Sequence, residues 1–304
     1  MYFNKVVTLI VCVSFLLSPQ DGFIVHSARA AESTPVIPAS LSVSSFYGYY
    51  SLGVTPGESV SLKLPVFLEN ISLKTLRGYR QAVALGLATE EEVNETRKKL
   101  TETAVSLTEK NFPGFMSKFK TVLLSRDPYK IANVMFGASL VNTYVRAVMA
   151  HDDFLKFTKS STRAAANIAV QNSMATLQAE ISTFYSVTKN LNLSEMTEEV
   201  FLKNYPAAQK VSGHVNEVTH ALAQFGLAAG GMGSGEQVNL ILVLVVALWF
   251  AVASWTKFWE LPDPSYGVVE PANPGSTVIS VIKENAAQLS GIDYGASIVP
   301  SPEQ

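Results

Sequence analysis

The stretch that decides the fold class is KNFPGFMSKFKTVLLSRDPYKIANVMFGASLVNTYVRAVM, residues 110–149. Its apolar side chains recur at three- and four-residue spacing, which is the period of an α-helix. Asp127 and Pro128 interrupt the series as an N-cap followed by a first-turn proline, and Pro113 stands where a first-turn proline is tolerated. The stretch therefore predicts two amphipathic helices. Their apolar positions are Phe112, Phe115, Phe119, Val122 and Leu123, then Ile131, Val134, Met135, Ala138 and Val141.

The segments on either side carry the same helical signals. Thr89-Glu90-Glu91-Glu92 is a capping box, which marks a helix start. A longer helix is expected over 162–191, and Ser194 is expected to cap a short helix that Pro206 ends. Strand patterns are almost absent, so residues 72–220 are predicted to form a mainly α, exported helical bundle. Buried positions expected in the longer helix are Ile168, Met174, Leu177, Ile181 and Phe184.

Residues 31–71 precede the bundle and mix Ser, Pro and Gly with an aromatic cluster. This composition predicts a flexible leader, with a short strand near Val60–Leu64. The cluster consists of Phe46, Tyr47, Tyr49 and Tyr50.

The N-terminus has the three parts of a secretory signal peptide. Lys5 supplies the positive charge, Val6–Leu17 the apolar core, and Ala28 and Ala30 the small residues before the cleavage point. An uncleaved N-terminal anchor is the alternative, although the apolar run is short for a membrane span. Cleavage removes Cys12, the only cysteine, so the exported chain depends on its core, a metal or a membrane for stability. We expect a bacterial protein that is secreted or membrane-associated outside the cytoplasm.

Composition narrows the class of partner. The 304 residues are 48% hydrophobic, the net charge is −2, and the mean hydropathy is +0.21. Neutralising phosphates requires a basic face, and none is visible, so nucleic acid is not an expected partner. The N-terminus and the last quarter of the chain carry most of the excess hydropathy.

The last quarter contains VNLILVLVVALWFAVASWTKFWE, residues 238–260. Residues 238–256 are uncharged, and as a helix they span about 28 Å, the thickness of a hydrocarbon core. A buried core helix is the alternative, but the stretch has no polar face. We therefore expect it to contact a bilayer, with an interfacial belt at the Trp-rich end. The residues expected to insert or to position the segment are Leu240, Ile241, Leu244, Val245, Leu248, Trp249, Phe250, Trp255, Lys257 and Trp259.

A second apolar segment, ALAQFGLAAGGMGSG at 221–235, comes just before this stretch. Its glycines predict a hinge, at Gly230, Gly231, Gly233 and Gly235. Residues 221–261 are therefore expected to form an apolar helical hairpin with one helix of transmembrane length. A Pro/Gly-rich link and tail follow at 262–304, with a modest helix over 277–290.

Catalytic patterns are weak. His151-Asp152-Asp153 lies near a helix end, and Glu217 with His220 has the spacing of one half of a di-iron motif. Neither a hydrolase serine elbow nor a dinucleotide-binding loop is present. We predict no catalytic, cofactor-binding or metal-ligating residue, and no enzymatic activity.

The chain resembles the sporulation-delaying protein family of secreted bacterial toxin precursors. The similar parts are FYGYYSLGVTPGES at 46–59, the block LTEKNFPGFMSKFKTVLLSRDPYKIANVM at 107–135 and the late apolar hairpin. The residues of the block that carry the resemblance are Pro113, Phe115, Met116, Ser125, Asp127, Pro128 and Met135.

The resemblance implies a precursor whose helical region is a pro-domain. Proteolysis would release the apolar segment as an antimicrobial peptide that inserts into target bilayers and dissipates the proton-motive force. It also implies processing proteins and a membrane immunity protein as partners. This chain lacks the cysteine pair found in the apolar region of the best-known such peptide. The alternative function is an extracytoplasmic helical interaction protein tethered by a single C-terminal transmembrane helix.

Overall fold

The computed structural model describes residues 39–52, 89–160, 168–229 and 274–290. This part of the chain is mainly helical and contains no strand, which confirms the predicted mainly α class. Its elements are α2 (Val43–Leu52), α4 (Glu90–Asn111), α5 (Phe115–Leu124), α6 (Pro128–Ser160), α8 (Ile168–Thr188), the 3-10 turn η1 (Leu193–Glu195), α9 (Glu198–Ala229) and α11 (Pro274–Ser290).

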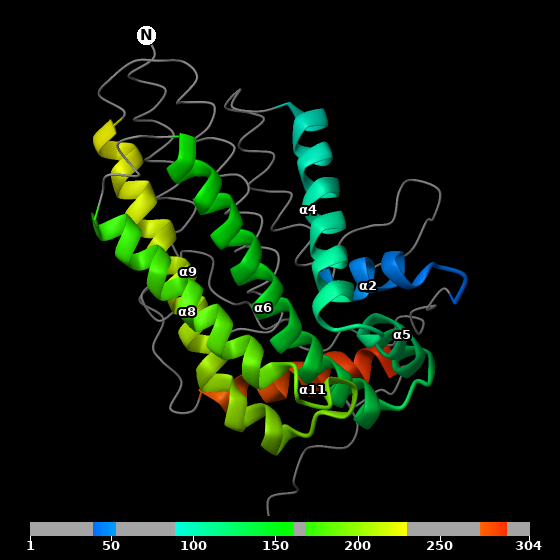
Figure 1. Cartoon of the computed structure of the whole chain (residues 1–304). Helices are drawn as coiled ribbons and strands as arrows, with labels where there is room; N and C mark the ends of the chain where they lie inside the picture. Colours follow the sequence, from blue (N-terminus) through cyan, green and yellow to red (C-terminus); the bar gives the residue numbers. More distant parts are fainter. Residues whose placement is uncertain (1–38, 53–88, 161–167, 230–273, 291–304) are drawn as a thin grey trace, which may run out of the picture.

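Helix α6 is the centre of the fold. It contacts α4, α5, α8, η1, α9 and α11, and Figure 1 shows it between α4 on one side and α8 with α9 on the other. Nearly every side chain from Ile131 to Ala150 is buried. Most of these buried residues are apolar, but Asn142 and Arg146 are buried as well, so neighbouring elements cover α6 on nearly every side over this range. The rest of the body is arranged around it.

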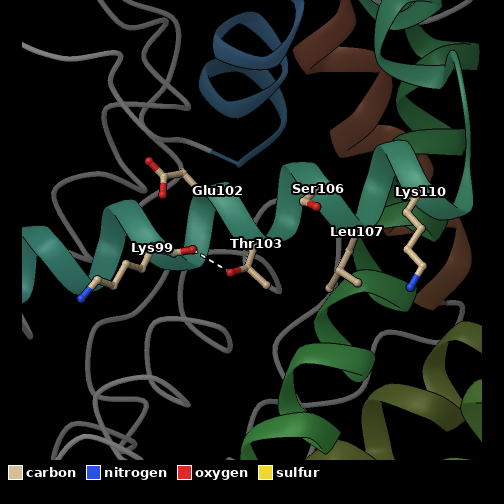
Figure 2. A pocket seen from close by; sticks show the side chains of 6 residues that line it. All are labelled: Lys99, Glu102, Thr103, Ser106, Leu107 and Lys110. Carbon is tan, nitrogen blue, oxygen red and sulfur yellow. Dashed lines mark hydrogen bonds between the residues drawn. The ribbon is translucent and has the colours of Figure 1, made fainter.

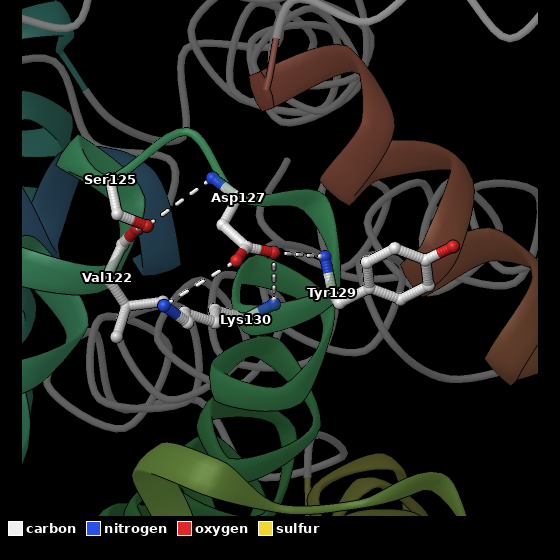
Figure 3. Close-up of polar contacts among 5 residues, drawn as sticks. All are labelled: Val122, Ser125, Asp127, Tyr129 and Lys130. Carbon is white, nitrogen blue, oxygen red and sulfur yellow. Dashed lines mark hydrogen bonds and ion pairs between the residues drawn. The ribbon is translucent and has the colours of Figure 1, made fainter.

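The start of α6 is as the sequence predicts. The Asp127 carboxylate accepts hydrogen bonds from the backbone amides of Tyr129 (3.0 Å) and Lys130 (3.2 Å), as Figure 3 shows. The Ser125 hydroxyl accepts from the Asp127 amide at 3.3 Å. These bonds satisfy amides that have no partner inside the helix. Pro128 then occupies the first helical position, where its missing N–H is no loss.

The turn before α5 differs from the prediction for Pro113. This residue lies outside the helix, and the N-cap is Gly114, whose φ of 76° places it in the left-handed region. Glycine adopts that region without steric cost, so it reverses the chain between α4 and α5. Helix α4 begins at Glu90, directly after Thr89, as the capping box predicts.

The flexible leader predicted for 31–71 is wrong at residues 43–52. These residues form α2, and the aromatic rings of Phe46, Tyr47 and Tyr50 are buried in the core. The Tyr47 ring packs edge-on against Phe119, with 5.2 Å between ring centroids. Burial of large aromatic surfaces outweighs the weak helix propensity of a Ser/Gly/Tyr segment. The strand expected at 60–64 lies outside the described residues.

The region after α8 departs from the expected pattern. Ser194 lies in η1 and does not start the next helix, because α9 begins at Glu198 behind Thr197. Pro206 lies inside α9 and does not end it. A proline inside a helix costs about 3 kcal/mol, but the apolar face of α9 is buried on both sides of it. Buried residues along this face include Phe201, Tyr205, Ala208, Val211, Val215 and Val218.

Helix α8 is buried as predicted at four of five positions. Met174, Leu177, Ile181 and Phe184 are buried, whereas Ile168, at the start of the helix, is 72% exposed. Ile168 lies at the edge of the packed region. There, an apolar position at helical spacing need not be covered by a neighbouring helix.

Among the described helices, none combines the length and the hydropathy needed to cross a bilayer. The stretch 238–260 lies outside the described residues.

Candidate functional site

The residues predicted to act on a membrane lie between two described helices. Segment 230–273, which holds the expected hinge glycines and every expected membrane-inserting residue, falls outside the described residues, as do Ala28 and Ala30. The structure describes the two helices that flank this segment. Helix α9 ends at Ala229, directly before it, and α11 begins at Pro274, directly after it.

The segment before residue 230 is continuous with the body. Helix α9 runs through the predicted boundary between 220 and 221 and ends only at Ala229. Val211, Val215 and Val218 bury its apolar face, and Lys210 Nζ lies 2.7 Å from Glu180 Oε1 of α8. Residues 221–229, which belong to the expected first arm of the hairpin, therefore continue a helix whose earlier part, up to Val218, is docked on the body.

The segment after residue 273 is docked as well. Helix α11 packs across α6 and also contacts α9, at the lower end of the bundle in Figure 1. Lys283 Nζ pairs with Glu198 Oε2 at the start of α9. The predicted helix over 277–290 is confirmed and extends back to Pro274. Its buried side chains include Val278, Ile279, Ile282, Asn285, Ala286 and Leu289.

The two attachment points lie far apart on the body. Helix α9 is about 48 Å long, and Glu198, at its start, pairs with Lys283 of α11. The C-terminal end of α9 lies at the opposite end of the bundle from α11 (Figure 1). One core thus fixes both flanks of segment 230–273, and it fixes them at separate places.

A buried polar cluster joins α2 to the middle of α6. Tyr47 donates to Asn142 Oδ1 at 2.9 Å, and Asn142 Nδ2 donates to the Ser51 hydroxyl at 3.0 Å. Burial raises the pKa of the Tyr47 phenol far above its ordinary value, and hydrogen bonds to Ser51 and Thr108 oppose that shift only in part. Tyr47 therefore stays protonated and cannot serve as a base. The cluster holds α2 in place.

A shallow groove of about 590 Å³ lies along α4 (Figure 2). The Thr103 hydroxyl donates to the Lys99 carbonyl at 2.8 Å, which is a bond within the helix. Figure 2 shows Glu102 pointing away from the side on which Leu107 and Lys110 lie. All the lining residues come from one helix, and no nucleophile is paired with a base among them, so we assign the groove no chemistry. They are Lys99, Glu102, Thr103, Ser106, Leu107 and Lys110.

Asp153 and His220 each belong to one of the two histidine patterns, and their side chains are not among those that the structure describes. Glu217 Oε2 lies 2.9 Å from His214 Nδ1, one turn earlier in α9. His151 Nδ1 lies 3.9 Å from Asp152 Oδ1, and burial lowers the pKa of this histidine. Within the described ranges, no three His, Cys, Asp or Glu side chains are placed to hold a metal ion.

Comparison of the chain with protein-family models, curated protein sequences and solved structures found no match.

Proposed function

We propose that this protein is a secreted precursor of a membrane-active antimicrobial peptide. The helical body carries the apolar segment within 230–273, and proteolysis releases that segment to insert into the membranes of target cells. The apolar length and the tryptophans of 238–260 support the membrane role. The resemblance to sporulation-delaying toxin precursors supports the release and the partners, which are processing proteins and a membrane immunity protein.

One observation favours this function over a single-pass anchor. A segment that crosses a bilayer once leaves its flanks on opposite sides, but α9 and α11 pack into the same core and are joined by Lys283 and Glu198. Residues 238–256 therefore cannot cross once while α11 is docked. An anchored protein would have to lose α11 from its core and expose Ile282 and Leu289, which are at most 1% exposed. If the apolar segment is instead cut out and released, α11 can stay docked and these side chains stay buried.

The end of α9 also revises the fragment that we expect to be released. A protease needs several residues of extended backbone, and the helical backbone of 221–229 offers them only after local unfolding. Cleavage between 221 and 229 is therefore disfavoured. We expect the new N-terminus to lie after Ala229, and the new C-terminus to lie before Pro274, where α11 begins.

Mass spectrometry of active culture supernatant tests the processing. The expected result is a fragment that contains 238–259 and lies within 230–273. Active material that contains only the chain 31–304 would contradict release, and a fragment that begins before 230 would contradict the boundary argued from α9.

A synthetic peptide of residues 230–261 tests the effector. We expect it to depolarise target cells, and we expect the matched peptide with Leu244→Lys and Leu248→Lys to be inactive, because each central lysine opposes insertion by roughly 3 kcal/mol. If the unsubstituted peptide leaves the membrane potential unchanged, the proposal is wrong.

An exchange of sequence separates an effector from an anchor. Replacing 238–256 by a poly-Leu segment of equal length keeps the hydropathy and removes the native side chains. We expect loss of killing. Retained biological activity would favour the tethered interaction protein.

A further inference from the structure

Helix α11 is separated from the rest of the body by 44 residues of chain, 230–273, yet it is built into the core. Ile282 and Ala286 are fully buried, and Leu289 is 1% exposed. These residues repeat at three- and four-residue spacing, so one continuous face of α11 is covered by the body. In water, isolated helices of about this length are marginal, so α11 owes its structure to that contact.

Among the described elements, the surface that receives α11 comes mainly from α6, and α9 contributes a smaller part that includes Glu198 at its start. Glu198 lies at the first position of α9, where a carboxylate is favoured by the helix dipole, and it pairs with Lys283. Both side chains of the pair are about half exposed, so the ion pair helps to orient α11 but contributes little to its affinity for the body. The apolar face of α11 provides most of the attachment.

We propose that α11 is retained by the body as a non-covalent second chain after the polypeptide is cut within 230–273. The interface depends on buried side chains on both partners and not on the covalent connection. The processed carrier is then a complex of a fragment ending near 229 and a fragment that contains 274–290, in a one-to-one ratio. After the apolar segment is excised, α11 still covers the core of the body.

This inference rests on the proposed function for its biological setting, because processing supplies the cuts. It has a second consequence for that function. A cut after the apolar segment alone frees its C-terminal end, while α9 still holds its N-terminal end. Release of the peptide from the body therefore requires cuts on both sides, and α11 does not leave with it.

The test uses the full chain with a site-specific protease sequence inserted between Pro262 and Asp263 and an affinity tag after Gln304. After cleavage under native conditions, the tagged fragment is captured and the body that remains with it is measured. We expect the body to be captured in equal molar amount, and to separate from the fragment in denaturant. Separation of the wild-type fragment in native buffer would overturn the proposal, and so would a complex with other than equal proportions.

Two substitutions provide a matched pair. Ile282→Asp places a charge in the buried face and should abolish capture of the body after cleavage. Ser280→Asp places the same charge on the exposed side of α11 and should leave capture unchanged. Equal retention of both variants would show that the buried face does not hold the fragment.

A milder variant covers the case in which Ile282→Asp prevents folding. Ile282→Ala removes three carbons from the interface, and exchange with added synthetic 274–290 peptide reports the strength of attachment. We expect the bound fragment to be held at least about thirtyfold more weakly than in the unsubstituted chain. An unchanged affinity would contradict the inference.

The outcome is independent of killing. If the fragment separates but peptide 230–261 still depolarises cells, the retention of α11 is wrong and the proposed function stands. If the fragment is retained and the peptide has no effect on membrane potential, the proposed function fails and the interface remains.

Discussion

At the scale of single residues, two positions in α6 have surroundings that constrain the side chain or its charge. Gly137 in α6 faces the backbone of η1, and a Cβ at this position would lie 1.9 Å from the Leu193 carbonyl oxygen. His151 lies inside the same helix, nine residues before its end at Ser160 and not at a helix end as expected, and partial burial lowers its pKa. Neither position is distinguishable in the sequence from a surface glycine or a surface histidine.

Gly137→Ala should destabilise the body by at least about 3 kcal/mol, because backbone cannot move aside as a flexible side chain does. Gly213→Ala is the matched control, since Gly213 is also helical and has no atom within 4 Å of an added Cβ. We expect that variant to be more stable by about 0.5–1 kcal/mol. Urea unfolding of the two variants measures the difference. Equal stabilities would show that η1 does not approach α6 as described.

His151 predicts how stability depends on pH. Burial lowers the pKa of the folded-state imidazole below its ordinary value near 6.5, and Asp152 opposes the shift only in part. The unfolded chain therefore binds the proton more readily. The contribution of neutral His151 is complete above about pH 6.5 and is lost as the pH falls below that value.

Unfolding measured between pH 7.5 and 5 should show this decline, and His151→Gln should reduce its slope. The exposed partner of the pair, Asp152, provides a control as Asp152→Asn, which should make the decline steeper because it removes the one opposing charge. A slope unaffected by His151→Gln would contradict the assignment.

At the scale of elements, the starts of α4 and α6 follow the local sequence, whereas the end of α9 follows packing. The Asp127 cap and the capping box at Thr89 each mark a helix start that is readable over four residues. The end of α9 was expected at Pro206, yet the helix continues to Ala229. The difference arises because a cap is a local bond, while the cost of an internal proline is offset by distant residues that bury Val211 and Val215.

Asp127→Ala should cost about 1 kcal/mol, since two first-turn amides of α6 lose their acceptor. Asp127→Asn keeps an acceptor oxygen in place and should cost about half as much or less. Thermal unfolding followed by circular dichroism distinguishes the two. Equal losses would indicate that the charge, and not the cap hydrogen bonds, is responsible.

At the scale of the whole molecule, one core holds both flanks of the apolar segment. Helix α6 is covered by helices from before and after residues 230–273, so the body is complete only when α11 returns to it. If the body is the carrier proposed above, its stability is therefore linked to the topology of the apolar segment. While α11 is docked on the same body as α9, the chain between them cannot cross a membrane only once.

The same topology is testable in intact cells. The exported chain has no cysteine if Cys12 is removed with the signal peptide, so single cysteines are specific reporters. Gln209→Cys on α9 and Ser280→Cys on α11 lie at exposed positions and should react equally with a membrane-impermeant maleimide before processing. Labelling of only one of them in the unprocessed chain would place the two helices on opposite sides of a membrane, as the anchored alternative requires.

Much of the fold was predictable from residues that act locally. The period of Ile131, Val134 and Ala138 predicted α6, and the same reasoning predicted the buried face of α8 apart from Ile168. The burial of α2 was not predictable, because Tyr47 and Asn142 are 95 positions apart and their hydrogen bond exists only in the folded chain. The candidate membrane segment was recognisable by hydropathy alone, but nothing in its composition indicates what lies beside its ends.

The helical class, the starts of α4 and α6 and the presence of an apolar segment of membrane-spanning length could therefore be read from the sequence alone. These properties depend on periodicity, capping and hydropathy, and each of these signals is local in the sequence. Only the tertiary structure decided that α2 belongs to the core, that α9 passes Pro206 and residue 220, and that α11 docks beside Glu198. Those outcomes depend on apolar surface buried between residues far apart in the chain, and such burial is a property of the assembled core.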